Sequence, residues 1–337
     1  MTRLFAFVAA ATVVWLAIVP QVEPQPTTIT AAIGSNMNHV PSFVGVEKGI
    51  FLKHGVDVKL KILNTGQEMS KALQAGEAQV IGAAFSNFPL AVERGMAAKG
   101  VVGSMGDRTT MHSDEPVSVW TRKGSGITTL EDLAGKRVGT PVGGTADEYL
   151  GAALKKKGIA RERVTLLNVM PGNSVSTLQG GSVDAVAVWE PYGSLVGAKV
   201  PDAQLVSRGG GYVGYYINIS FRNDLIEKDP QLVERFVLAF AEASQYTRQH
   251  LDEGAEIATR WIPGLDLPVA RTAIRNLTFD PRITRHTIAA WEENVRTLID
   301  QKKLRAALPW QQGMEPRFIE RVVKERPELF SDLKPVP

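Results

Sequence analysis

The segment Lys136–Gly158, with the sequence KRVGTPVGGTADEYLGAALKKKG, decides the fold. Its first five residues, 136–140, predict a short strand, and two glycines follow in the next turn. Thr145 and Glu148 then have the spacing of a capping box. The apolar residues after them recur at helical spacing and predict an amphipathic helix: Ala146, Tyr149, Leu150, Ala153 and Leu154. A strand, a turn and a helix in this order form a βα unit, which is typical of a parallel sheet.

The same order of elements repeats on both sides of this segment. Apolar, β-branched runs predict strands at 28–33, 56–63, 78–84, 136–140, 164–169 and 183–188. After residue 229 the pattern is helical only, and Asp229-Pro230 and Asp280-Pro281 each precede a predicted helix. We therefore expect two βα series, and late helices that pack back on the first of them.

Composition excludes several classes of protein. A length of 337 residues favours about two domains, and 44% hydrophobic residues are enough for a packed core. The 38 basic and 35 acidic residues are scattered, without aromatic residues between clustered cations, so nucleic acid is not an expected partner. The absence of cysteine excludes disulfides, thiolate metal sites and a lipid-modified N-terminal cysteine.

The N-terminus predicts export. Arg3 precedes Leu4–Val19, a run of sixteen residues in which only Thr12 is not apolar. This length is nearer to the apolar region of a signal peptide, about 7 to 15 residues, than to a membrane-spanning helix of about 20. We expect residues 1–26 to be a signal peptide and the protein to work in the periplasm. An uncleaved membrane anchor is the alternative, because Pro20–Pro24 offers no clear cleavage site.

Motifs for cofactors and catalysis are weak. Gly209, Gly211 and Gly214 match the pattern GxGxxG, but a strand pattern follows where a dinucleotide site needs a helix. No two of the five histidines lie four residues apart, and no nucleophile is paired with a base. We therefore expect no cofactor, no metal and no enzymatic activity.

Tyr215-Tyr216 is the remaining motif, because adjacent tyrosines bind ferric iron in one class of exported protein. Neighbours in a strand point to opposite faces. The preferred interpretation is one ring in the core and one facing a cleft, and we do not favour ferric-ion binding.

The turns between strands and helices predict a ligand cleft. In open parallel sheets, ligands bind outside the carboxyl ends of the strands, where helices begin. Four such turns lie at 34–39, 85–87, 141–145 and 189–191, two in each series. Two facing sheets would bring these turns together, and helix N-termini favour an anionic group.

Two of these turns carry the more specific signals. Gly143-Gly144-Thr145 would let a ligand approach the backbone and would add a hydroxyl donor; a tight turn with Thr145 as a cap is the alternative. Trp189 would form a flat apolar wall, and Glu190 would supply a fixed charge. The alternative is a buried structural tryptophan beside a helix cap at Glu190.

Four blocks resemble a known family. Val46–Val56, VEKGIFLKHGV, is similar to a block in substrate-binding proteins of ABC importers for sulfonates, taurine, nitrate and thiamine-precursor pyrimidines. Leu73–Gly76, Leu133–Gly139 and Asp184–Pro191 resemble that family in the same order. The resemblance covers about residues 28–225.

The resemblance implies a type II periplasmic binding protein fold. Two α/β lobes would be joined by two crossing strands, near Val117–Thr121 and Tyr212–Phe221. The first lobe would contain residues 27–116 and 217–337, and the second lobe 117–216. Carried over by position, the ligand-binding residues would be Asn36, His39, Ser86, Asn87, Gly143, Gly144, Thr145, Trp189, Glu190 and Tyr215.

The function that this resemblance implies is that of a monomeric receptor. It would deliver a small anionic or zwitterionic solute, such as a sulfonate or taurine, to a membrane-embedded ABC permease. Helix starts at Asn87 and Thr145 beside Glu190 predict a ligand with one anionic end and one cationic or polar end. The alternatives are a thiamine-precursor pyrimidine, an aromatic carboxylate, or a solute sensor for a membrane kinase.

Overall fold

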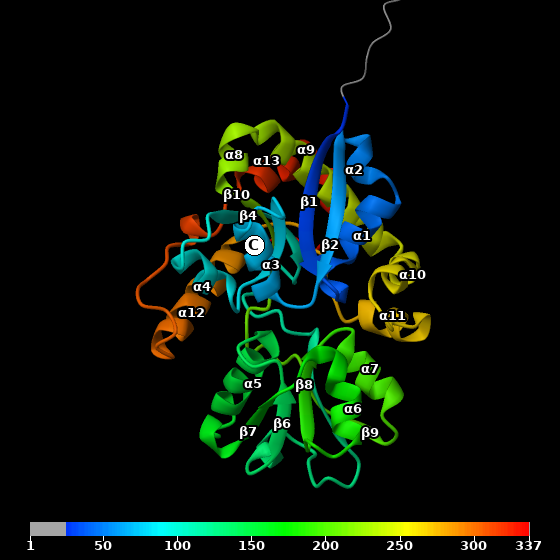
Figure 1. The fold of residues 1–337 in the computed structure, drawn as a ribbon, viewed down its shortest axis with the longest axis vertical. Helices are drawn as coiled ribbons and strands as arrows, with labels where there is room; N and C mark the ends of the chain where they lie inside the picture. Colours follow the sequence, from blue (N-terminus) through cyan, green and yellow to red (C-terminus); the bar gives the residue numbers. More distant parts are fainter. Residues whose placement is uncertain (1–24, 337) are drawn as a thin grey trace, which may run out of the picture.

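The computed structural model describes residues 25–336, which form two five-stranded sheets (Figure 1). The predicted signal peptide falls almost entirely on residues 1–24, outside the described part. The first sheet has the order β2-β1-β3-β10-β4 and the second has the order β7-β6-β8-β5-β9. The strands are β1 (Thr27–Gly34), β2 (Val56–Leu63), β3 (Val80–Ala84), β4 (Ala98–Met105), β5 (Val117–Arg122), β6 (Arg137–Thr140), β7 (Thr165–Asn168), β8 (Ala185–Trp189), β9 (Ala203–Arg208) and β10 (Ile217–Arg222).

Each sheet with the helices packed on it is called a lobe below. The first lobe carries α1 (Val40–Glu47), α2 (Ile50–Lys53), α3 (Gly66–Gln74), α4 (Phe88–Glu93), α8 (Asn223–Lys228), α9 (Pro230–Gln249), α10 (Leu251–Trp261), α11 (Leu267–Ile274), α12 (Arg285–Asp300) and α13 (Arg317–Glu325). The second lobe carries α5 (Thr145–Lys156), α6 (Ser174–Gln179) and α7 (Tyr192–Lys199). Within residues 25–336 no helix combines the length and the apolar character that a membrane span requires.

Each sheet is parallel except for one inserted strand. In the first sheet β10 lies antiparallel between β3 and β4, and in the second sheet β5 lies antiparallel between β8 and β9. The remaining strands run in one direction because helices connect them, as the βα pattern of the sequence predicts. Both inserted strands follow directly after the chain has crossed from the other lobe. The chain therefore leaves the first sheet once, forms the second sheet, and returns once to the first.

The two crossings lie at residues 106–116 and 209–216. The first crossing was predicted near Val117–Thr121; it lies directly before these residues, which are β5 of the second sheet. The second crossing was placed at Tyr212–Phe221, and its later half is β10 of the first sheet. Both predictions are displaced because a β-rich run does not show where sheet pairing begins.

A buried carboxylate joins the two crossings. Asp114, in the first crossing, has no exposed surface. Its oxygens accept hydrogen bonds from the backbone N–H groups of Gly211 at 2.9 Å, Tyr212 at 2.6 Å and Val213 at 3.2 Å, all in the second crossing. Gly211 has a φ of 70°, in the left-handed region where glycine is favoured. The glycine motif that resembled a dinucleotide signature is thus part of a turn that points three amides at one carboxylate.

A buried cation fixes the same region to the first lobe. The Arg108 guanidinium donates to the backbone oxygens of Ile217 at 2.9 Å and Met105 at 3.1 Å, and to Asn218 Oδ1 at 3.1 Å. It also lies 4.5 Å from the ring centroid of Tyr216. Burial lowers the pKa of Arg108 to about 10, which leaves the group charged at neutral pH. These acceptors hold both crossings against β4 and β10.

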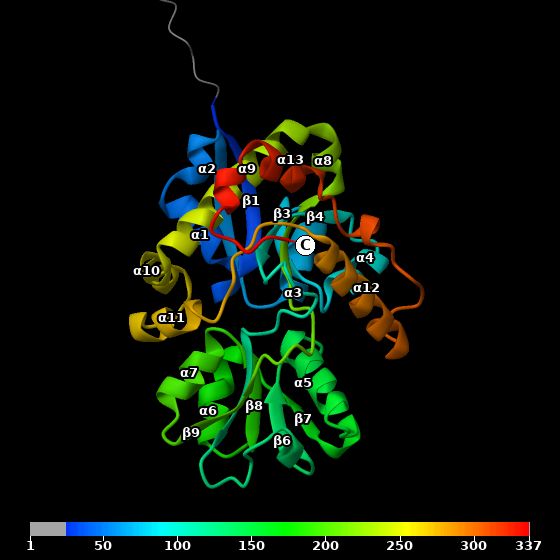
Figure 2. The same ribbon diagram turned by 180° about the vertical axis from the view of Figure 1, so that it is seen from behind.

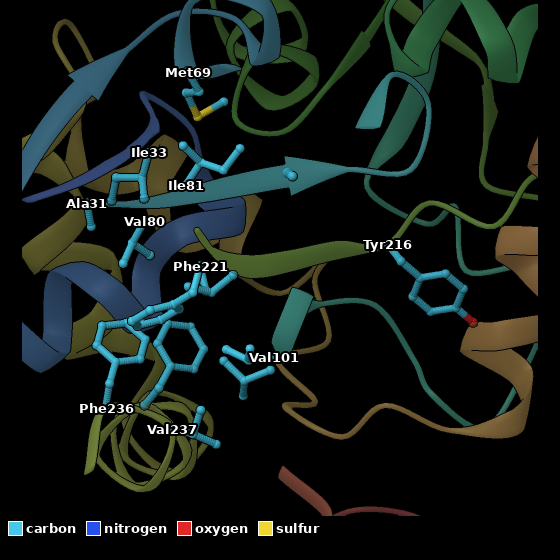
Figure 3. Packing of buried hydrophobic residues seen from close by; sticks show 14 of the residues in the cluster. Ala31, Ile33, Met69, Val80, Ile81, Val101, Tyr216, Phe221, Phe236 and Val237 are labelled. Carbon is cyan, nitrogen blue, oxygen red and sulfur yellow. The ribbon is translucent and has the colours of Figure 1, made fainter. Parts of the chain in front are cut away.

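The late helices share the core of the first sheet. Figure 3 shows Phe236 and Val237 of α9 beside Phe221 of β10 and Val101 of β4. The rings of Phe221 and Phe236 pack edge to face with centroids 4.9 Å apart. Trp291 of α12 is also fully buried in this core. The helical tail of the sequence therefore supports the first sheet and does not form a third domain.

We predict that Asp114→Asn weakens the connection between the two crossings and destabilises the protein. An asparagine keeps the shape of the side chain, but its NH2 group would face backbone donors and leave buried N–H groups unsatisfied. The free energy of unfolding should fall by about 2 kcal/mol, measured by urea denaturation. Asp300→Asn, at an exposed position on α12, is the matched control and should leave it unchanged. An equal loss in both variants would contradict this role of Asp114.

Candidate functional site

The carboxyl ends of the two parallel sheets face each other and touch. Ser86, in the turn after β3, has its Oγ atom 2.9 Å from Oγ1 of Thr145, in the turn after β6. The Tyr192 hydroxyl at the start of α7 donates to the backbone oxygen of Ser35 after β1 at 3.0 Å. Turns from both lobes therefore line one shared cleft, and the described conformation is closed.

The turn before α5 differs from its prediction in one respect. The predicted capping box is wrong, because Gly144 is the N-cap residue and Thr145 is the first residue of the helix. The N–H group of Gly143 is instead bound by the carboxylate of Asp147 at 2.8 Å. Thr145 is therefore not occupied with closing its own helix, and its hydroxyl points across the cleft to Ser86.

The turn after β1 forms a packed part of the first lobe. Asn36 caps the 3-10 helix η1 (Met37–His39), because its Oδ1 atom accepts the Asn38 N–H at 3.1 Å. Only 1% of His39 is exposed, and burial lowers the pKa of its imidazole to about 3. A Cβ atom added at Gly82 would lie 2.1 Å from the His39 ring. His39 is thus a neutral packing residue at neutral pH and offers no positive charge to a ligand.

Both tyrosines of the Tyr215-Tyr216 pair are buried. In the described, closed conformation Tyr215 is 4% exposed and Tyr216 is not exposed. The Tyr215 hydroxyl accepts a hydrogen bond from Asn38 Nδ2, and the Tyr216 hydroxyl donates to the backbone oxygen of Asp107 at 3.1 Å. Burial raises the pKa of both phenols. Among residues 25–336, no cluster of three or more metal-ligating His, Cys, Asp or Glu side chains occurs.

Trp189 lies at the mouth of the cleft in the second lobe. It ends β8 and is half-buried, and a Cβ atom at Gly144 would lie 3.7 Å from its indole ring. The indole Nε1 is buried and has no hydrogen-bond partner. Buried donors in folded proteins are rarely left unsatisfied, so this N–H marks a place for an acceptor that the chain itself does not supply.

Two further hydroxyls share this property and were missed by the sequence analysis. Thr140 ends β6 and Ser174 begins α6, and the side-chain oxygen of each is buried without a hydrogen-bond partner. Thr140 is the last residue of a parallel strand of the second sheet, as Trp189 is, and Ser174 follows the 3-10 helix η4 (Pro171–Asn173) after β7. For Thr140, the position at a strand end was the available signal.

Glu190 has a different role from the predicted one. The residue is fully buried, and its carboxylate accepts from Arg208 Nη1 at 2.5 Å and Asn276 Nδ2 at 2.8 Å. Its second oxygen accepts the N–H group of Ser194 in α7 at 3.0 Å. The charge that was expected to face a ligand is therefore paired within the protein. This geometry favours the alternative interpretation, in which Glu190 caps its helix.

Asn87 and Gly143 lie at the edges of the cleft. Asn87 is half-buried and makes no capping bond to α4, and its amide lies 2.7 Å from a Cβ atom added at Gly66. Gly143 is exposed and has a φ of 79°, so its lack of a side chain permits the turn. Neither residue makes a contact across the cleft among the hydrogen bonds of the described residues.

A cavity of about 1260 Å³ opens beside this contact, between α5 and α12. Its inner end is formed by Ser86, Gly143 and Gly144, and its floor by residues 211–214 of the second crossing. The other predicted site residues do not line it: Asn36, His39, Asn87, Thr145, Trp189, Glu190 and Tyr215. The cavity is thus a groove that leads to the closed cleft from one side.

The two-lobed architecture and the cleft between facing strand ends define a type II periplasmic binding protein fold. The chain belongs to the NMT1/THI5 like family, which matches residues 36–254. A Bacillus subtilis protein named for binding aliphatic sulfonates is 25% identical over 87% of this chain and 88% of its own length. The taurine-binding periplasmic protein of Escherichia coli is 26% identical over 66% of this chain and 67% of its own length. A Brucella abortus protein named only as a binding protein is 24% identical over 65% of this chain, and the match spans 66% of that relative.

Solved structures show the same fold. The alkanesulfonate-binding protein of Xanthomonas axonopodis pv. citri, bound to MOPS, has a TM-score of 0.74 and 16% identity, with 87% of this chain and all of that chain covered. The nitrate-binding protein of Synechocystis PCC 6803 has a TM-score of 0.73 and 12% identity, with 92% of each chain covered. A desulfurization enzyme has a TM-score of 0.69 and 16% identity over 89% of this chain and 99% of that chain. The fold thus occurs in binding proteins and in an enzyme.

We predict that Glu190→Ala destabilises the protein, because it leaves the Arg208 guanidinium without its partner and removes an acceptor for Asn276. Breaking a buried pair in this way costs about 3 kcal/mol, measurable by urea denaturation. Glu190→Gln keeps the shape of the side chain and one acceptor oxygen, so that either the Ser194 N–H or Asn276 keeps its acceptor, and it should cost less than alanine. An alanine variant as stable as the parent would show that the pair is not structural.

Proposed function

We propose that this chain is the solute-binding receptor of an ABC importer and that it binds a small organic oxyanion between its lobes. The observation that carries this proposal is the set of unpartnered donors at the carboxyl end of the second sheet. Trp189 Nε1 and the Thr140 and Ser174 hydroxyls are buried without partners, and the Trp189 ring lies beside Gly144, the N-cap residue of α5. Donors without acceptors, beside a helix N-terminus, favour a ligand rich in acceptor atoms.

The pairing of Glu190 revises the proposed charge of the ligand. A free carboxylate in the cleft would require a cationic group on the solute, and the sequence analysis predicted such a two-ended ligand. Because Arg208 and Asn276 already bind this carboxylate, a simple anion leaves no buried charge unpaired. We therefore favour an alkanesulfonate over a zwitterionic solute such as taurine.

The relatives support an oxyanion as the class of ligand. The names of the relatives and solved structures refer to aliphatic sulfonates, taurine, alkanesulfonate and nitrate. These compounds share a compact group of negatively charged oxygens. A thiamine-precursor pyrimidine or an aromatic carboxylate is the alternative, and both are tested by the same ligand screen.

A receptor fits the cleft better than an enzyme. The hydroxyls of Ser86 and Thr145 are hydrogen-bonded to each other, and no hydrogen bond in the described structure joins either of them to a base. His39 is buried and neutral. A nucleophilic mechanism needs a base within hydrogen-bond reach of the attacking hydroxyl. We accordingly assign a binding role, in a monomer that delivers its solute to a membrane-embedded permease.

The proposed receptor also has a proposed cellular location and a proposed division into two units that close on the solute. The protein would work in the periplasm, with residues 27–116 and 217–337 in one closing unit and residues 117–216 in the other. Domain closure around a ligand is an established motion of two-lobed receptors. A solute sensor for a membrane kinase would use the same closure, and the genes beside this one, for a permease or a kinase, distinguish the two.

We predict that a short alkanesulfonate stabilises the protein against heat. At about 100 times its dissociation constant, a ligand of the native state adds about 2.7 kcal/mol of stability. Thermal unfolding should be measured with hexanesulfonate, taurine, nitrate, benzoate, an aminopyrimidine and, as a cationic control, putrescine. A shift with putrescine and none with the oxyanions would overturn the proposed ligand class.

We predict that Trp189→Ala weakens binding of the stabilising ligand by more than tenfold, and that Trp189→Phe also weakens it. Phenylalanine keeps an apolar ring but removes the N–H donor. The two variants therefore distinguish the contribution of apolar contact to ligand affinity from that of the hydrogen bond. Trp120→Phe is the control, because the Trp120 N–H is already bonded to Ser118 Oγ at 2.9 Å. Calorimetric titration gives the dissociation constants. Normal affinity in both Trp189 variants would show that this residue belongs to the core.

A further inference from the structure

A contact between α5 and α12 joins the two lobes beside the cleft. Figures 1 and 2 place these helices on the same side of the molecule, one in each lobe. Asn294 Nδ2 of α12 donates a hydrogen bond to Glu148 Oε1 of α5. Helix α12 is held to the first lobe by Trp291, whose ring packs edge to face on Phe85 at 5.4 Å and on Phe88 at 6.0 Å. Opening of the cleft at this side therefore requires the Glu148–Asn294 contact to separate.

The hydrogen bonds of Asn294 are incomplete. The residue is 7% exposed, and its Oδ1 atom is buried without a donor. A carboxylate at Glu148 can accept from the Asn294 amide but cannot donate to it. A carboxylic acid can do both, because its O–H group can donate to Oδ1 while its other oxygen accepts from Nδ2. The geometry thus suits a neutral Glu148, paired with the amide through two hydrogen bonds.

Charged groups of α5, of α12 and of the segment after α12 surround Glu148. On α5 itself Asp147 is paired with Arg161, and on α12 Glu293 lies 2.7 Å from His112 Nε2. Lys303 follows α12 and faces the same groove. Burial of the carboxyl group raises the pKa of Glu148 to about 7, while the Asn294 hydrogen bond and Lys303 oppose this shift, and Asp147 and Glu293 add to it.

We propose that Glu148 and Asn294 form a proton-dependent latch. Glu148 binds a proton as the cleft closes, and the resulting acid–amide pair holds α5 against α12. The latch acts on closure itself and is independent of which solute binds. Glu148 and Asn294 are positioning residues, since they act by joining the lobes.

The sign of the pH effect follows from the two forms of the protein. In an open form the carboxyl group is solvated and has its ordinary pKa of about 4.5, whereas in the closed form the pKa is about 7. At pH values between these two pKa values, Glu148 therefore binds a proton when the cleft closes. The closed population relative to the open one should fall by up to tenfold per pH unit as the pH rises through this window. This ratio of closed to open protein should be constant at pH values below and above the window.

The test measures closure without any ligand, so its outcome is separate from that of the proposed function. The chain contains no cysteine, and Lys123→Cys with Lys324→Cys places one spin label on an exposed position of each lobe. Electron–electron resonance distances of the ligand-free full chain are recorded at pH 5 and pH 8. We expect one shorter distance to dominate at pH 5 and a longer one to gain at least tenfold in relative population at pH 8.

Variants of the spin-labelled protein test whether Glu148 and Asn294 cause the pH dependence of the distances. Glu148→Gln carries a neutral amide at every pH and should stay closed at pH 8, while Asn294→Asp places a second carboxyl group in the contact and should be more open at pH 8. Glu162→Gln, at an exposed position of the second lobe, should behave as the parent. Circular dichroism at both pH values checks that each variant is folded.

Three results would overturn the proposal. The parent could show the same distances at pH 5 and pH 8, or Glu148→Gln could respond to pH as strongly as the parent. His112→Gln could abolish the response, which would assign it to the His112–Glu293 pair instead.

Discussion

The arrangement of the two lobes is fixed by the buried side chains of Asp114 and Arg108, which hold the two crossings together and are called the clamp below. Three backbone N–H groups of residues 211–213 converge on the Asp114 carboxylate, and the Arg108 guanidinium ties the same region to β4 and β10. Both charges are buried and fully supplied with partners, so the crossings cannot shift past each other without breaking several charge-assisted hydrogen bonds. The clamp therefore fixes which strand ends face each other, while the lobes can still rotate about it.

The cleft follows from this alignment. With the carboxyl ends of both sheets facing each other, Ser86 meets Thr145 in the centre. On one side of the centre Glu190 bonds to Asn276, and on the other side Glu148 bonds to Asn294. Closure thus makes several polar contacts between the lobes, and one of them includes a carboxyl group whose pKa is raised to about 7. If the proposed latch operates, proton uptake accompanies the same closure that the proposed solute would require.

Local patterns in the sequence predicted the elements, and long-range pairing explains the differences. The spacing of Thr65 and Glu68 also predicts a capping box, and the structure contains it, because both residues lie within one helical turn. The role of Glu190 depended on Arg208, which comes near it through the pairing of β8 and β9 with β5, and on Asn276, which comes near it only when the two lobes pack. The crossing segments were displaced for the same reason, since strand propensity does not reveal the sheet a strand joins. Composition and periodicity therefore identify the fold, whereas the partners of each buried charge require the three-dimensional arrangement.

We propose that an oxyanion binds between the lobes and accepts a hydrogen bond from Trp189. Nitrogen-15 NMR of the uniformly labelled protein tests it directly through the indole N–H resonance of Trp189, assigned by its loss in a Trp189→Phe spectrum. Addition of hexanesulfonate should shift this resonance downfield and slow its exchange with solvent, because a buried donor gains an acceptor. A saturating titration that shifts other resonances and leaves the Trp189 indole unchanged would contradict the account.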